Sequence, residues 1–138
     1  MKYGSLIMEK KDYLTLKRIL NFHRFYEDYA HKDALEQLGE RIDRALVEDE
    51  KDMPDDVVRL NSTITVEFAQ GTKQKFELVP STRANLKENM VSVVSKLGAS
   101  LVGLAVGDQI QFGFPSDVQS FKIVGVEQSH QLSSSFEV

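Results

Sequence analysis

The sequence predicts an α+β protein, in which a pair of antiparallel helices precedes a small antiparallel sheet that carries one short helix. Three observations predict this fold class. Before residue 48, apolar residues recur in steps of three and four. After residue 57, they alternate in short runs that are separated by turn residues. Between these parts, residues 48–56 contain six acids, one base and a proline, which is typical of a solvated connector.

The first part predicts a helical hairpin. One apolar stripe runs from Lys10 to about Tyr29 and a second from Asp33 to about Val47, with only a few residues between them. Each stripe is too narrow to be stable alone, so we expect the two helices to fold back on each other. Asp33 suits a helix N-cap or first turn. The short apolar run at residues 6–8 is a candidate strand.

The second part predicts five strands, at residues 62–68, 75–79, 90–94, 109–114 and 121–126, with a turn at 70–72. A short helix should lie between the third and fourth strands, with Ser95 as its N-cap and Gly103 or Gly107 as its stop. Asp108 is expected to cap a turn rather than to act in catalysis. We therefore divide the chain into a helical hairpin, residues 1–50, and a sheet domain, residues 51–138.

Composition excludes several function classes. The 138 residues suit one ordinary domain, or a small domain with an appendage. The chain contains no cysteine, and His23, His31 and His130 have no metal-ligand spacing, so we expect no metal and no cofactor. No phosphate-binding loop, dinucleotide fingerprint or nucleophile elbow is found, which argues against an enzyme.

Charge and hydropathy indicate the kind of partner. The net charge is −4, and it lies in residues 1–56, which hold 10 Lys and Arg against 14 Asp and Glu. This sign does not favour direct sequence-specific binding of nucleic acid, whereas it allows a basic protein partner or a bound cation. No apolar run is long enough to span a membrane, and the N-terminus lacks a signal-peptide pattern. We expect a cytoplasmic protein with no membrane partner.

Two motifs resemble the bacterial Gre transcript-cleavage factors and their relative Rnk, the regulator of nucleoside diphosphate kinase. Residues 95–108 resemble the Gre pattern Ser-Pro-Leu-Gly, Ala-Leu-Leu-Gly and Val-Gly-Asp, with Lys96 where the family often has proline. Residues 53–62, Met-Pro-Asp-Asp-Val-Val-Arg-Leu-Asn-Ser, are closer to the Rnk branch. The resemblance covers about residues 53–128. It implies an FKBP-like sheet domain that carries a short antiparallel coiled coil.

The resemblance also implies binding to RNA polymerase near the entrance of its secondary channel. In the Gre branch, a long coiled coil carries an acidic tip that helps to hold a catalytic magnesium ion, whereas the Rnk branch has a shorter coiled coil without that activity. For the sheet domain, the expected partner contacts are Ser95, Lys96, Gly98 and Ser100. For the hairpin tip, they are Tyr26, Glu27, Asp28, Tyr29 and Asp33.

Two interpretations of the tip remain open. Asp33 and Glu36 have a spacing that could share a magnesium ion with a partner, but a helix-start residue and a solvated charge explain them more simply. Phe25, Tyr26 and Tyr29 either cap the hairpin core or form a contact surface. A first helix of 20 residues would be about 30 Å long, which is shorter than the Gre hairpin.

We therefore predict a monomeric, non-enzymatic transcription regulator of the Gre/Rnk type whose partner is RNA polymerase. One alternative is a cleavage-stimulating factor that acts through Glu27, Asp28 or Asp33. An alternative from another class is an FKBP-like prolyl isomerase or peptide-binding module. Phe112, Phe114 and Phe121 could line its pocket, although alternating strand residues of this kind are expected to be core.

Overall fold

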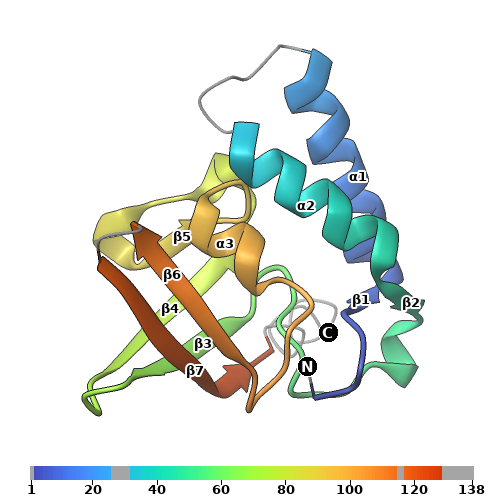
Figure 1. Ribbon diagram of the computed structural model, residues 1–138. Coiled ribbons are helices and arrows are strands. Elements are labelled where there is room, and N and C mark those ends of the chain that lie inside the picture. The colour runs from blue at the N-terminus through green and yellow to red at the C-terminus, as the bar shows by residue number, and fades with distance from the viewer. Residues whose placement is uncertain (1, 26–31, 115–116, 129–138) are drawn as a thin grey trace.

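A computed structural model describes residues 2–25, 32–114 and 117–128 of the chain. It begins with strand β1 (Ile7–Glu9), helix α1 (Lys10–Phe25), helix α2 (Lys32–Arg44) and strand β2 (Leu46–Glu48). In Figure 1 the two helices lie side by side and project away from the sheet. The hairpin and the leading strand that the sequence predicts are confirmed. The predicted end of the first helix, residues 26–29, lies outside the described residues.

The hairpin is held together by the apolar stripes of its two helices. Leu16 and Leu20 of α1 are buried, and so are four apolar side chains of α2, namely Ala34, Leu35, Leu38 and Ile42. Burying both stripes against each other stabilises two helices that are too short to be stable in isolation. The spacing of the apolar residues therefore translates directly into packing.

The second helix ends earlier than the sequence predicts. It stops at Arg44, and Leu46–Glu48 form β2, which pairs in parallel with β1. The apolar residues Leu46 and Val47 continue the spacing of the helical stripe, but their backbone pairs with β1, the strand that precedes α1. A three-residue run cannot be assigned to a helix or a strand by periodicity alone, so the partner strand decides the outcome.

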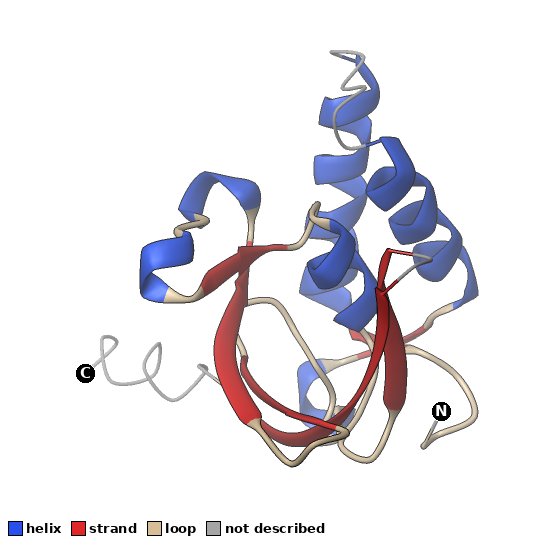
Figure 2. Cartoon of the chain, turned by 60° about the vertical axis from the view of Figure 1, so that its left-hand side comes forward, coloured by secondary structure: helices blue, strands red, loops and turns tan. Residues whose placement is uncertain are grey.

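The second part is a curled five-stranded sheet, seen from the side in Figure 2. Its strands are β3 (Thr63–Phe68), β4 (Lys73–Val79), β5 (Met90–Ser92), β6 (Gln109–Phe114) and β7 (Asp117–Glu127), in the spatial order β5-β4-β3-β7-β6. All five predicted strands are confirmed. Three of the pairings are antiparallel, as expected, but β5 runs parallel to β4. Two single-turn 3₁₀ helices, Ser81–Arg83 and Leu86–Glu88, form the connection that allows this direction.

Helix α3 (Lys96–Leu101) packs against both the sheet and α2. One core cluster includes Leu16 and Leu38 from the hairpin together with Ile64 and Leu101 from the sheet part. The acidic run between the two parts contains a 3₁₀ turn, Glu50–Asp52. The division at residues 50 and 51 stays a prediction. Among the described helices, none combines the length and the apolar character that crossing a bilayer requires.

Candidate functional site

The turn that begins α3 is built by hydrogen bonds of Ser95. The Gly98 N–H donates to the Ser95 hydroxyl oxygen at 3.0 Å, and this hydroxyl donates to the Ser92 carbonyl oxygen at 2.6 Å. Ser95 is therefore the N-cap that the sequence predicts. Because its hydroxyl makes both of these bonds, Ser95 fixes the conformation of the turn.

Gly98 permits the close approach of α3 to the end of β5. A Cβ atom on Gly98 would overlap the carbonyl oxygen of Ser92 and would lie 3.0 Å from the Leu78 side chain. Gly98 is itself buried. The residue is required here for packing, because any side chain would push the helix away from the sheet.

The remaining two predicted contacts in α3 differ in exposure. Ser100 is buried and its hydroxyl donates to the Leu97 carbonyl oxygen at 2.6 Å. Lys96 is exposed at the start of the helix. Of the four sheet-domain residues that we expect to meet a partner, only Lys96 therefore presents an exposed side chain.

Asp108 caps the turn that follows α3, as the sequence predicts. Its carboxylate accepts from the Ala105 N–H at 2.9 Å and from the Lys2 backbone N–H at 2.7 Å. Gly107, at φ +98°, supplies the left-handed conformation that this turn needs. The bond to Lys2 ties the N-terminal segment to the sheet part, and no spacing in the sequence signals it.

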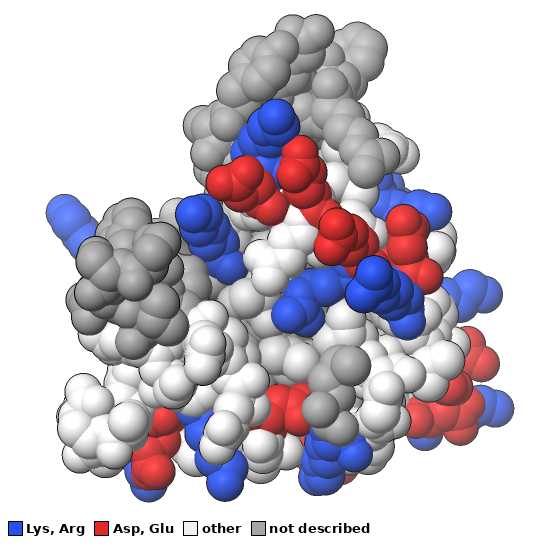
Figure 3. All heavy atoms as spheres, viewed as in Figure 1, with Lys and Arg blue, Asp and Glu red and all other residues white. Residues whose placement is uncertain are grey.

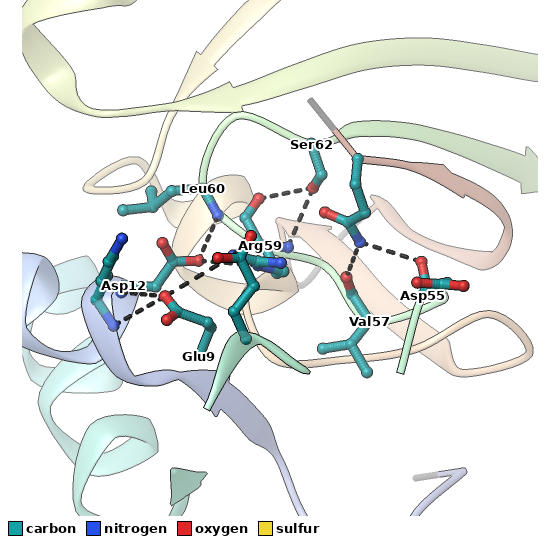
Figure 4. Close-up of polar contacts among 10 residues, drawn as sticks. Glu9, Asp12, Asp55, Val57, Arg59, Leu60 and Ser62 are labelled. Atoms are coloured by element: carbon teal, nitrogen blue, oxygen red, sulfur yellow. Dashed lines mark hydrogen bonds and ion pairs between the residues drawn. The ribbon is translucent and has the colours of Figure 1, made fainter. Parts of the chain in front are cut away.

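A buried cluster of charges joins the base of the hairpin to the chain that enters the sheet (Figure 4). The Glu9 carboxylate accepts from the Lys11 N–H at 2.8 Å and from the Asp12 N–H at 3.1 Å, so it caps the first turn of α1. Asp12 in turn accepts from the Leu60 N–H at 3.1 Å. The two carboxylates thereby fix where α1 begins relative to the sheet part.

Arg59 is the cation of this cluster. Its guanidinium lies 3.7 Å from a carboxylate oxygen of Glu9, 3.7 Å from one of Asp12 and 4.0 Å from one of Glu50. Burial raises the pKa of Asp12 to about 6, although the Leu60 N–H and the Arg59 charge act in the opposite direction. Sequence reasoning missed this cluster. Its one local signal is a charged Arg59 inside the apolar run 57–60.

The hairpin tip lies largely beyond what the structure describes. Tyr26, Glu27, Asp28 and Tyr29 fall outside the described residues. Asp33 is exposed in the first turn of α2, one turn before the exposed Glu36. In the described ranges, no group of three or more His, Asp or Glu side chains could hold a metal ion.

A groove lies between the N-terminal segment and the last turns of α2. Its volume is about 440 Å³, and it is lined by Gly4, Ser5, Leu6, Gln37, Glu40, Arg41 and Arg44. On this side of the molecule, acidic side chains gather on the hairpin and basic side chains lie directly below them (Figure 3). The Arg41 guanidinium donates to the Val102 carbonyl oxygen at 3.5 Å, and burial lowers the pKa of Arg41. Arg41 therefore links α2 to the end of α3.

The aromatic side chains of the sheet that the structure describes pack in or against its core. Phe121 is buried, and its ring meets that of Phe68 edge-on at a centroid distance of 5.6 Å. The side chains of Phe112 and Phe114 lie outside the description. Phe121 is thus the core residue that the alternation of the strand predicts.

Comparison with known proteins identifies the family. The model of the family "Transcription elongation factor, GreA/GreB, C-term" matches residues 53–128, which include the Ser95 turn and α3. The chain belongs to this family. The predicted resemblance to the Gre proteins is confirmed, and the leaning toward the Rnk branch stays a prediction.

Two relatives named transcription elongation factor GreA illustrate the similarity. The chain is 30% identical over 93 residues to that of Syntrophus aciditrophicus (strain SB), covering 67% of this chain and 58% of the relative. It is 33% identical over 92 residues to that of Clostridium acetobutylicum, covering 66% and 58%. The matched region thus spans less than two thirds of these GreA proteins.

A solved structure supports the fold. The GreA/GreB transcription elongation factor from Nitrosomonas europaea superposes with a TM-score of 0.77 at 24% sequence identity. The match covers 90% of this chain and 100% of that one. The predicted α+β architecture, with two N-terminal helices and a curled sheet, is therefore shared with a GreA/GreB protein.

Proposed function

We propose that this Gre-family chain is a transcription regulator that docks on RNA polymerase through the surface around α3, without catalysis of its own. The observation that carries the proposal is the family match over residues 53–128, which contains the whole of α3. The relatives matched over this region are named transcription elongation factors. RNA polymerase is the partner that the Gre resemblance implies.

Lys96 is the side chain that we assign to this contact. It is exposed at the first position of α3, directly after the Ser95 N-cap. The capped turn and the close packing of Gly98 hold that position in place. A fixed lysine at a helix start can pair with a carboxylate of the partner and contribute to the rate and specificity of docking.

The proposed absence of cleavage activity rests on the size of the hairpin. The described helices have 16 and 13 residues, which correspond to about 24 and 20 Å. By resemblance, the cleavage-stimulating Gre factors carry a longer coiled coil. A shorter hairpin would dock at the same entrance without bringing carboxylates to the catalytic metal of the polymerase.

Binding of the full chain to immobilised core RNA polymerase tests the docking surface. We expect Lys96→Glu to weaken binding about tenfold or more, because the charge reversal places like charges at the contact. Lys87→Glu is the matched control, since Lys87 is exposed and lies in the separate 3₁₀ turn Leu86–Glu88. Equal affinities of both variants and the wild type would contradict the assignment of Lys96.

A further inference from the structure

The edge of β2 offers an unpaired backbone. The Leu46 N–H donates to the Leu6 carbonyl oxygen at 2.8 Å, while the Ile7 N–H points the other way and donates to the Gly103 carbonyl oxygen at 3.2 Å. Strand β1 is therefore enclosed on both sides, and β2 is outermost. In a strand, backbone groups of alternate residues point to opposite sides. The N–H and C=O of Val47 thus point away from β1, where no strand of the described chain pairs.

The side chains of this edge are apolar and exposed. Leu46 is 51% exposed and Val47 is 42% exposed. Because neighbouring residues of a strand face opposite sides, each face of the strand carries one of them. Leu46–Glu48 contain no lysine, proline or bulge, which are common protections of such an edge, although the strand is short and ends in Glu48.

The surrounding charge selects among possible occupants. After Val47 come Glu48, Asp49, Glu50, Lys51 and Asp52, which hold four acids and one base, and Arg44 precedes the strand. The nearby cation Arg59 already lies against Glu9, Asp12 and Glu50. A second copy of this chain would bring the same acids together at the edge. A basic segment would instead be attracted to it.

We propose that β2 accepts an extended segment of a partner protein as a third strand, and that this segment alternates apolar residues with Lys or Arg. Its backbone pairs with Val47, its apolar side chains pack beside Leu46 or Val47, and its cations face residues 48–52. This is strand addition to an exposed edge, in which the backbone supplies affinity and the side chains supply specificity. The site lies outside residues 53–128, the part of the chain that the family model matches, and does not include α3.

The probe is a fluorescein-labelled Lys-Val-Lys-Val-Lys-Val-Lys peptide, added to the ¹⁵N-labelled full chain. We expect chemical-shift changes centred on residues 46–48 and an exchange rate of the Val47 amide at least ~10-fold slower in the complex. The corresponding peptide with Glu in place of Lys should not bind. These measurements use the wild-type protein, so they do not depend on the folding of any variant.

Two double variants locate the site. Leu46→Lys/Val47→Lys should lower the affinity for the basic peptide at least ~10-fold. Gln70→Lys/Gln74→Lys adds the same charge at exposed positions in and beside the β3–β4 turn and should change the affinity less than ~2-fold. Four results would overturn the proposal: no binding, shifts centred on β5 or β6, a Val47 amide already protected in the free monomer, and a dimer that pairs through β2.

Discussion

At the scale of single residues, Asp12 is a carboxylate whose burial should make stability depend on pH. Its pKa is raised from 3.8 to about 6. Between these two values, Asp12 keeps its proton in the folded state and loses it in the unfolded chain. The stability that protonated Asp12 contributes is therefore fully present below about pH 4 and is lost as the pH rises through about 6. This difference corresponds to at most about 3 kcal/mol.

Asp12→Asn should remove this dependence, because the amide oxygen can still accept from Leu60 and carries no charge. We expect urea unfolding of the variant to be less sensitive to pH between about 4 and 7 than that of the wild type, and its stability at pH 7 to be at least equal. Asp43→Asn, at an exposed position of α2, is the control and should retain the wild-type profile. An unchanged slope in Asp12→Asn would contradict the role of burial.

Leu101 carries a second prediction at this scale. It is fully buried in the core cluster beneath the sheet. Leu101→Ala should lower the free energy of unfolding by roughly 2–5 kcal/mol, because it removes apolar contacts and leaves a cavity. Leu14→Ala, on the exposed side of α1, should cost less than about 1 kcal/mol. A small effect at Leu101, measured by urea unfolding, would mean that the helix packs differently.

Residues whose role is local could be predicted from the sequence, and residues whose partners are distant could not. As N-cap and turn cap, Ser95 and Asp108 bond to residues within a few positions, so their residue types were sufficient to predict these roles, whereas the bond of Asp108 to the distant Lys2 was missed. Glu9 and Arg59 are separated by 50 positions and meet only after both parts have folded. The burial of the Glu9 and Asp12 carboxylates beside the Arg59 guanidinium depends on that assembly, which periodicity does not encode.

At the scale of elements, α3 depends on its approach to the end of β5. Gly98→Ala should move the helix away from the Ser92 carbonyl group and lower stability by about 1–3 kcal/mol. Gly125→Ala is the matched control in a strand, since its added Cβ would meet Thr65 at an ordinary contact distance of 3.5 Å. We expect ¹H–¹⁵N spectra to change around residues 92–101 in the first variant only. Identical spectra and stabilities would contradict the close approach.

Long periodic elements followed from the sequence, and short or paired ones only in part. The stripes of α1 and α2 and the alternation of β3 and β6 extend over enough residues to define a period. Strand β2 has three residues, and its pairing with β1 replaced the predicted last turn of the second helix. The parallel direction of β5 was also missed, because it depends on the path of residues 80–89.

At the scale of the whole molecule, the hairpin and the sheet part share buried surface. Their core residues form one cluster, and the charges around Arg59 and the Arg41 contact to Val102 join them further. Because the hairpin contacts the sheet part at several points, these contacts fix its orientation relative to the sheet. The orientation and length of α1 and α2 therefore determine how far the hairpin can extend into a partner.

The last prediction concerns that reach. Assistance to a polymerase-bound magnesium ion requires carboxylate oxygens at about 2.1 Å, so a shortfall of a few ångströms abolishes it. With described helices of 16 and 13 residues, we expect the chain to bind polymerase without stimulating transcript cleavage in stalled, backtracked complexes. In the same assay it should slow cleavage by an added Gre factor, because both would occupy one docking surface. Cleavage by this chain alone would establish the alternative function if Glu27→Ala/Asp28→Ala/Asp33→Ala abolished it while polymerase binding persisted.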